Sequence, residues 1–141
     1  MMKRNQVDLR FSIWNFEDLS HSEISDTLGL LPQKVYIKGE FRNPKNTNPD
    51  SPRVKKNGWI LNSGLDEYAP FEHQMNNLLD ILEPRIDTLK EISVKYLCEF
   101  SCALHVYRDN GESTPSVHLD ERYNNFIKEV NVEFDLDLYV V

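Results

Sequence analysis

The sequence predicts an α+β fold, with a single twisted mixed sheet, helices mainly on one face, and elements in the order β-α-β-β-α-β-α-β. Three observations support this prediction. Apolar and polar residues alternate along residues 7–13 and again along 132–140, as in strands with one buried face. Apolar residues recur every three or four positions across 71–89, which is the spacing of one helical face. Short connections with right-handed crossovers favour helices on one side, and the first six elements match the ferredoxin-like βαββαβ order.

The size and composition of the chain indicate one domain over residues 1–141. A length of 141 residues is enough for one core, and a hydrophobic fraction of 40% excludes a disordered tail. No apolar run approaches the ~20 residues of a membrane span, and no signal-peptide core follows the first methionines. We therefore expect a cytoplasmic protein that contacts no membrane.

The first helix is predicted from its caps. It begins at His21, because Ser20 and Glu23 have the spacing of a capping box. Gly29 is placed to take the left-handed conformation just past the helix end. The helix is therefore expected to last only about two turns.

Stretches rich in β-branched and aromatic residues predict the remaining strands. Residues 34–39 and 58–61 are two such stretches, and they are separated by a basic loop at about 40–57. A later strand is expected at 95–107. Ser116 is then expected to cap a short helix that precedes the last strand.

A proline interrupts the long helical stripe in the second half of the chain. Pro84 lacks the backbone N–H that would bond to the carbonyl four residues earlier. The sequence therefore predicts two helices, roughly 70–82 and 84–92, or one kinked rod of the same phase. Either arrangement keeps the apolar stripe facing inward.

Cys98 and Cys102 are predicted to be buried free thiols. Four residues of strand span about 13 Å, roughly twice the Cα separation that a disulfide tolerates. Alternation along the strand puts both cysteines on the same face as Phe100, where they act as small hydrophobic residues. The histidines are scattered without ligand-like pairing, so we expect no metal site.

Several short groups of residues form a combined pattern of caps, turns and core positions. They are Leu19-Ser20, Ile24, Leu28-Gly29-Leu30, Pro32, Lys38-Gly39-Glu40, Trp59, Leu61, Ser63 and Phe134-Asp135-Leu136. On these residues the chain resembles the bacterial family catalogued as domain of unknown function 4279, over nearly its whole length. The resemblance implies a shared fold and brings no catalytic residues with it.

Residues 23–35 also look like the first helix and turn of a helix-turn-helix. The following Tyr36-Ile37 is poor for a recognition helix, and no three-helix context surrounds the segment. The formal net charge of −7 argues against general affinity for nucleic acid. We therefore expect no nucleic-acid partner.

The charges are unevenly distributed along the chain. Residues 1–70 carry 10 basic and 9 acidic side chains, whereas 71–141 carry 6 and 14. The basic loop in the first half is a candidate site for a small anionic ligand, with the loop acting as a lid. The candidate ligand-binding residues are Lys38, Arg42, Lys55, Lys56 and Trp59. The alternative is a solvated loop whose charges only keep it soluble.

The last predicted strand carries Glu133, Asp135 and Asp137 on one face, at intervals of about 7 Å. Such a carboxylate ridge is a candidate binding site for a basic partner protein, because opposite charge speeds the encounter. The alternative is an ordinary solvent-facing surface, partly neutralised by Arg10 on a neighbouring strand. Steps of ~7 Å along one strand cannot converge on a single metal ion without other ligands.

These features favour a non-catalytic protein–protein interaction domain, immunity-like or antitoxin-like, as the first functional hypothesis. The second is a domain that binds a small anionic ligand with the 38–56 loop. An enzyme with an unrecognised site is third, because no catalytic or nucleotide-binding motif is present. No cofactor is expected, and the sequence leaves the partner's identity and the oligomeric state open.

Overall fold

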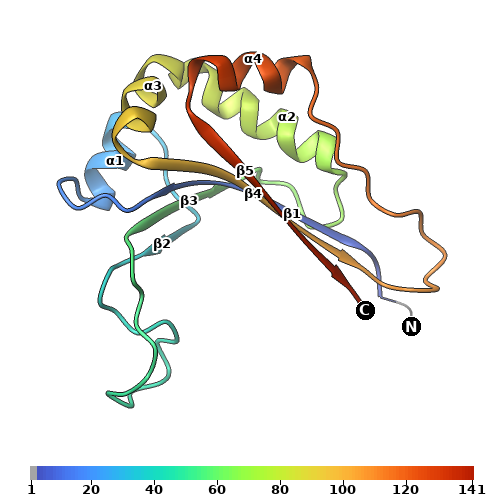
Figure 1. Ribbon diagram of the computed structural model, residues 1–141, viewed down its shortest axis with the longest axis horizontal. Helices are drawn as coiled ribbons and strands as arrows, with labels where there is room; N and C mark the ends of the chain where they lie inside the picture. The colour runs from blue at the N-terminus through green and yellow to red at the C-terminus, as the bar shows by residue number, and fades with distance from the viewer. Residues whose placement is uncertain (1–2) are drawn as a thin grey trace.

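The computed structural model describes residues 3–141 and contains one β-sheet with α-helices packed against it (Figure 1). In chain order the elements are β1 (Gln6–Trp14), α1 (His21–Leu28), β2 (Lys34–Tyr36), β3 (Gly58–Asn62), α2 (Phe71–Leu82), a 3₁₀ turn (Glu83–Arg85), α3 (Ile86–Lys95), β4 (Leu97–Val106), α4 (Glu121–Glu129) and β5 (Val132–Val140). The sheet order is β2-β3-β1-β4-β5. The β4–β5 pair is parallel and the other pairs are antiparallel. An α+β fold with a single mixed sheet, as the sequence predicts, is therefore confirmed.

The core lies between the sheet and the helices, and Figure 1 shows α2, α3 and α4 on one side of the sheet. Alternation along each strand turns one row of side chains toward these helices. In β1 that row consists of Val7, Leu9, Phe11 and Ile13, all buried. The chain between β2 and β3 extends away from the sheet on the opposite side (Figure 1). The molecule therefore has a helix-covered face and an outer face, and this loop lies on the side of the outer face.

The ends of α1 agree with the predicted caps. The Ser20 hydroxyl accepts a hydrogen bond from the Glu23 N–H at 3.0 Å, and the Glu23 carboxylate accepts one from the Ser20 N–H at 3.2 Å. This is the reciprocal pattern of a capping box. Gly29 follows with φ +68°, in the left-handed region that favours glycine, and ends the helix.

The predicted start of the last helix at Ser116 is wrong. Helix α4 begins at Glu121, and the Asp120 carboxylate caps it by accepting a hydrogen bond from the Tyr123 N–H at 3.0 Å. The chain around Ser116 has no helical structure. Both residue types are good caps, and the sequence does not show which one precedes the helical turn.

Pro84 breaks the long helical stripe into α2 and α3, joined by the short 3₁₀ turn. The Arg85 side chain holds this turn in place by donating to the Ile81 carbonyl at 2.8 Å. It also donates to the Leu28 carbonyl at the end of α1. Helix C-termini carry unpaired carbonyls and a negative partial charge. A guanidinium there donates hydrogen bonds to the carbonyls and balances the charge. Arg85 thereby ties α1 to the junction between α2 and α3.

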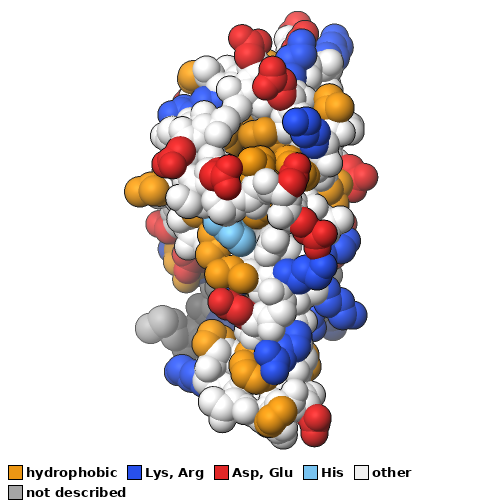
Figure 2. Space-filling view, turned by 90° about the vertical axis from the view of Figure 1, so that its left-hand side faces the viewer, with side chains coloured by type: hydrophobic (Ala, Val, Ile, Leu, Met, Phe, Trp, Pro, Cys, Tyr) orange, Lys and Arg blue, Asp and Glu red, His pale blue; other side chains and the backbone are white. Residues whose placement is uncertain are grey.

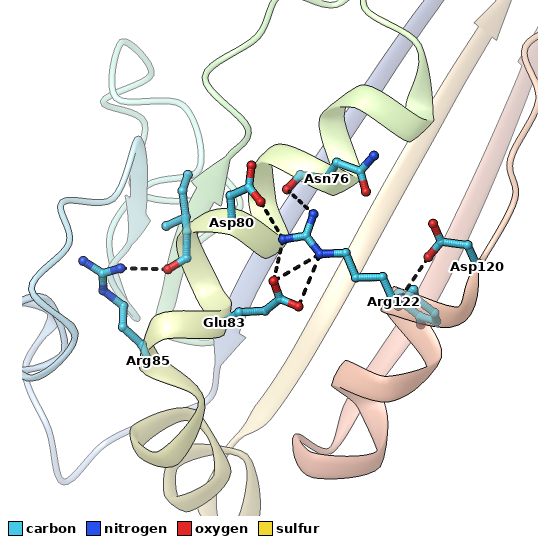
Figure 3. A network of polar contacts seen from close by, with 8 residues as sticks. Asn76, Asp80, Glu83, Arg85, Asp120 and Arg122 are labelled. Carbon is cyan, nitrogen blue, oxygen red and sulfur yellow. Dashed lines mark hydrogen bonds and ion pairs between the residues drawn. The ribbon is translucent and has the colours of Figure 1, made fainter.

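A second arginine joins α4 to α2, as Figure 3 shows. The Arg122 Nε donates to the Glu83 carboxylate at 3.1 Å, and its Nη1 donates to the Asn76 carbonyl at 3.3 Å. Its remaining nitrogen, Nη2, pairs with Asp80 and Glu83. The hydrogen bond to Glu83 is the largest of the effects that raise the pKa of the Arg122 guanidinium.

Replacing Arg122 by alanine is expected to lower the free energy of unfolding by about 1 kcal/mol, because a partly exposed set of ion pairs is lost. Urea denaturation of the parent and variant measures the difference. Arg108→Ala removes the same side chain from an exposed position after β4, and should change stability by less than about 0.5 kcal/mol. Equal effects of the two substitutions would contradict a specific role for Arg122.

Cys98 and Cys102 are buried free thiols on the helix-facing side of β4, as predicted. Burial raises the pKa of both thiols to about 12. Since the thiolate is the reactive form of cysteine, burial disfavours nucleophilic reactivity at both residues.

Strand β5 differs from its prediction on one of its two faces. Glu133, Asp135 and Asp137 are exposed, as expected. Leu136 and Leu138 lie on the helix-facing side but are 48% and 59% exposed. Because β5 is an edge strand, the helices cover only its first residues. The sequence pattern predicts a buried row along the whole strand, and that prediction is wrong beyond Phe134.

Candidate ligand-binding site

The outer face of the sheet carries an aromatic pair built around a glycine. Trp14 of β1 and Tyr36 of β2 lie on either side of Gly58 of β3 in the strand register. A Cβ atom at position 58 would lie 2.5 Å from the Trp14 ring, so only glycine leaves room for this ring. Trp14 therefore extends across β3 and stacks on Tyr36, with ring centroids 5.5 Å apart and an interplanar angle of 28°.

Basic side chains surround this aromatic pair. The Lys34 ammonium lies 4.6 Å from the centroid of the Tyr36 ring. Arg42, Lys55 and Lys56 approach from the loop between β2 and β3. Together with part of β4 they enclose an open cleft of about 630 Å³, which we call the outer-face cleft. This volume is in the usual range for small-molecule sites, roughly 300–1,000 Å³. Its lining residues are Trp14, Lys34, Tyr36, Arg42, Val54, Lys55, Lys56, Leu97 and Glu99.

The loop is folded back on itself by its own backbone. The Gly39 N–H donates to the Val54 carbonyl at 2.9 Å, and the Val54 N–H donates to the Glu40 carbonyl at 2.8 Å. The Arg53 guanidinium lies 3.8 Å from the centroid of the Phe41 ring. Because of these contacts, the two halves of the loop lie side by side, and its basic side chains lie beside the sheet. Figure 2 shows Lys and Arg side chains interleaved with hydrophobic ones in the lower part of the molecule, where the loop lies.

The structure brings together some of the predicted ligand residues and separates others. Arg42, Lys55 and Lys56 line the outer-face cleft. Lys38 lies outside it and pairs with Glu17. Trp59 is fully buried on the helix-covered side, where its indole N–H donates to the Ser25 hydroxyl at 3.0 Å. Trp59 directly follows the glycine under Trp14, and consecutive strand residues point to opposite faces.

Sequence reasoning missed Trp14, Tyr36 and Glu99 as cleft residues. One signal was available for Trp14, which occupies a polar position in the alternating pattern of its strand. A large aromatic residue at such a position is directed to the outer face. The other two depend on which strands are neighbours, and that order is not readable from the sequence.

Glu99 connects the cleft to the acidic ridge. It pairs in register with Glu133 across β4 and β5. The pKa of Glu99 is raised, first by burial and then by repulsion from Asp135, Glu133 and Asp137. The outer face therefore has a basic side over the loop and an acidic side along β5, with Glu99 between them.

Replacing Glu99 by glutamine is expected to stabilise the folded protein at about pH 7. Because folding raises the Glu99 pKa, ionisation costs stability above the folded pKa, and this cost disappears below the ordinary value of 4.5. Urea unfolding at about pH 7 and at about pH 4 should therefore show a stability gain that shrinks at the lower pH. Glu91→Gln, at an exposed position on α3, is the matched control. A Glu99→Gln variant that is less stable than the parent at neutral pH would contradict this interpretation.

The acidic ridge of Glu133, Asp135 and Asp137 is not neutralised by Arg10. The Arg10 guanidinium instead binds Asp8 on its own strand, at 3.0 and 3.1 Å. The hydrogen bond to Asp8 is the main cause of the raised pKa of Arg10. Asp8 therefore neutralises the cation that the sequence suggested for the ridge.

Residues 3–141 contain no arrangement typical of a metal site and no membrane-spanning helix. Within this range, no group of His, Cys, Asp or Glu side chains is arranged to hold a metal ion. No helix there has the length and apolar character needed to cross a bilayer. His105 stacks on Tyr139 of β5, with ring centroids 4.9 Å apart, and its Nδ1 has no hydrogen-bond partner among the residues that the structure describes.

The chain was compared with family models, curated proteins and solved structures, and a family model matches it. Residues 5–141 match the family model described as Domain of unknown function (DUF4279), which covers essentially the whole chain. The search of curated proteins found no match, and the search of solved structures found none either.

Proposed function

Since this chain belongs to the DUF4279 family, whose description assigns no activity, we propose its function from the outer-face cleft: a non-catalytic domain that binds a small anionic ligand. The observation that supports this proposal most strongly is that Arg42, Lys55 and Lys56 line the cleft together with an aromatic floor. This floor is the stacked pair of Trp14 and Tyr36. Among the described residues, no carboxylate lies within ion-pair distance of these three side chains. An anion that enters the cleft meets positive charge without displacing an internal partner.

The architecture supports this proposal through the position of the loop. The order β2-β3-β1-β4, with antiparallel pairs, is the order that a ferredoxin-like core has, and we propose that relationship for the scaffold. In such a scaffold the helices occupy one face and leave the other free for ligands. The β2–β3 connection is the element that borders the free face here. The cytoplasmic location suggested by the sequence stays a prediction.

The test is a titration with inorganic pyrophosphate, followed by isothermal calorimetry or by the rise in melting temperature. Lys55→Ala/Lys56→Ala is expected to weaken binding about 10-fold to 100-fold, because two charged hydrogen-bond donors are lost. Lys38→Ala/Lys45→Ala is the matched control, since it removes the same charge from the same loop outside the cleft. Equal weakening of binding by both double variants would indicate non-specific electrostatic attraction and would contradict the proposed site. Absence of any binding would do the same.

A second candidate is the protein–protein interaction role, immunity-like or antitoxin-like, which the acidic ridge suggests. One observation favours it: β5 is an edge strand with exposed acids on one side and the exposed Leu136 and Leu138 on the other. An extended segment that alternates basic and apolar residues would complement both sides while pairing with the open edge.

This second candidate is tested with a synthetic peptide that alternates lysine and valine, compared with one that alternates glutamate and valine. Binding of the lysine peptide that weakens with salt and is lost in Glu133→Lys/Asp135→Lys would support the role. Equal binding of the two peptides, or none, would argue against it.

A further inference from the structure

We propose that the ligand of the outer-face cleft is a free nucleotide, whose planar nitrogen base lies on Trp14 and Tyr36 and whose phosphate meets Arg42, Lys55 and Lys56. This inference rests on the proposed anion-binding function and adds the ligand class. It follows from three features of the cleft that a simple inorganic anion does not explain: the stacked rings of Trp14 and Tyr36, the carboxylate of Glu99, and the position of Glu99 on a different wall from Arg42, Lys55 and Lys56.

The aromatic floor is shaped for a flat ring. The position of a Cβ at residue 58 would lie 2.5, 2.8 and 3.0 Å from three adjoining carbons of the Trp14 six-membered ring. If the Cβ position lay in the plane of that ring, the two outer carbons would be markedly farther from it than the middle carbon is. The Trp14 ring therefore turns one face toward Gly58 of β3, and Tyr36 stacks against Trp14 with the ring centroids 5.5 Å apart.

Both rings remain partly exposed, and the exposed parts line the cleft. A phosphate alone gains nothing from such a surface, because its oxygens seek hydrogen-bond donors. A nucleobase gains stacking energy, and the ring of any base presents the necessary π face. Lys34, held over Tyr36, adds a cation beside the same stack.

Glu99 is unfavourable in a site for a simple anion, because its carboxylate repels one. It lines the cleft from β4, whereas Arg42, Lys55 and Lys56 line it from the loop. Within residues 3–141, the Glu99 side chain accepts no hydrogen bond from the protein, and only burial and neighbouring carboxylates act on it. A ligand with N–H donors at one end and a phosphate at the other can donate to Glu99 and also bind the basic side chains. A nucleotide with an exocyclic amine carries its donors and its phosphate in this way.

The geometry favours a free nucleotide over a nucleic-acid strand. The outer face continues from Glu99 to Glu133 and then along the rest of the acidic ridge. A chain of phosphates that extended past the base in that direction would meet carboxylates. A single nucleotide carries no further phosphate that would meet them.

The test is calorimetry on the full-length chain with adenosine monophosphate, ribose 5-phosphate, inorganic pyrophosphate and a short oligoadenylate. Adenosine monophosphate is expected to bind about 10-fold or more tightly than ribose 5-phosphate, because only the former stacks. It should also bind more tightly, per site, than the oligoadenylate. These comparisons use the unmodified protein and do not depend on any variant that could fail to fold.

The variants then locate the effect. Trp14→Leu should bring the two affinities to within about 3-fold of one another, while Tyr68→Leu, an aromatic residue outside the cleft, should leave their ratio unchanged. If ribose 5-phosphate or pyrophosphate binds as tightly as the nucleotide, the nucleotide inference fails and the anion-binding function stands. If tighter oligoadenylate binding is observed, a nucleic-acid strand replaces the free nucleotide. If none of the probes binds, the proposed function fails as well.

Discussion

Replacing Phe100 by alanine is expected to lower the free energy of unfolding by about 3–5 kcal/mol, a large fraction of the roughly 5–15 kcal/mol that keeps a domain folded. Phe100 lies on β4 and is fully buried. Its ring centroid is 5.5 Å from that of Phe11, 5.8 Å from that of Tyr123 and 6.1 Å from that of Phe126. The side chain therefore joins two central strands to α4, and its removal leaves a cavity bounded by three rigid rings.

The measurement is urea denaturation followed by circular dichroism. Phe41→Ala, in the loop between β2 and β3, is the matched control and should cost less than about 1 kcal/mol. Phe100→Leu keeps most of the volume and should lie between the parent and the alanine variant, so a graded result remains measurable if Phe100→Ala does not fold. A cost for Phe100→Ala no larger than that for Phe41→Ala would mean that the core is packed differently.

Replacing Gly58 by alanine is expected to lower the free energy of unfolding by about 1–3 kcal/mol. The backbone at this position has no positive φ, and alanine in a strand is ordinarily better than glycine by about 0.5–1 kcal/mol. The expected sign is reversed because the new methyl group would lie 2.5 Å from the Trp14 ring and force it away.

A double-mutant cycle tests this explanation directly. In a Trp14→Ala background the obstruction is gone, so Gly58→Ala should become neutral or stabilising. Loss of the stacked pair should also weaken ligand binding in Gly58→Ala alone. A destabilisation that is equal in both backgrounds would show that Trp14 does not lie on the glycine.

Local signals in the sequence were sufficient to predict several elements. Ser20 and Glu23 fixed the start of α1 because a capping box acts within one turn of chain. Pro84 marked the break between α2 and α3 for an equally local reason. The strand pattern of 132–140 gave the bounds of β5 and the exposure of its acids.

The remaining features depend on contacts between distant segments. The apolar side of β5 is exposed because this strand ends up at the sheet edge, beyond the helices. The outer-face cleft depends on the pairing of β2 and β1 with the same glycine of β3. The sequence drew attention to Trp59 and to the loop lysines, and the strand register shows that Trp14, not Trp59, lies beside Tyr36 on the outer face.

The most direct test of the outer-face cleft is a titration of the isotope-labelled protein with adenosine monophosphate, followed by nuclear magnetic resonance of the backbone amides and the tryptophan indoles. The chain has two tryptophans, so it gives two indole N–H signals, one from each face of the sheet. We predict that the Trp14 indole and the Lys55 and Lys56 amides shift with nucleotide concentration, while the Trp59 indole stays in place. A shift of Trp59 alone, shifts confined to β5, or no shift at about 1 mM nucleotide would contradict the account.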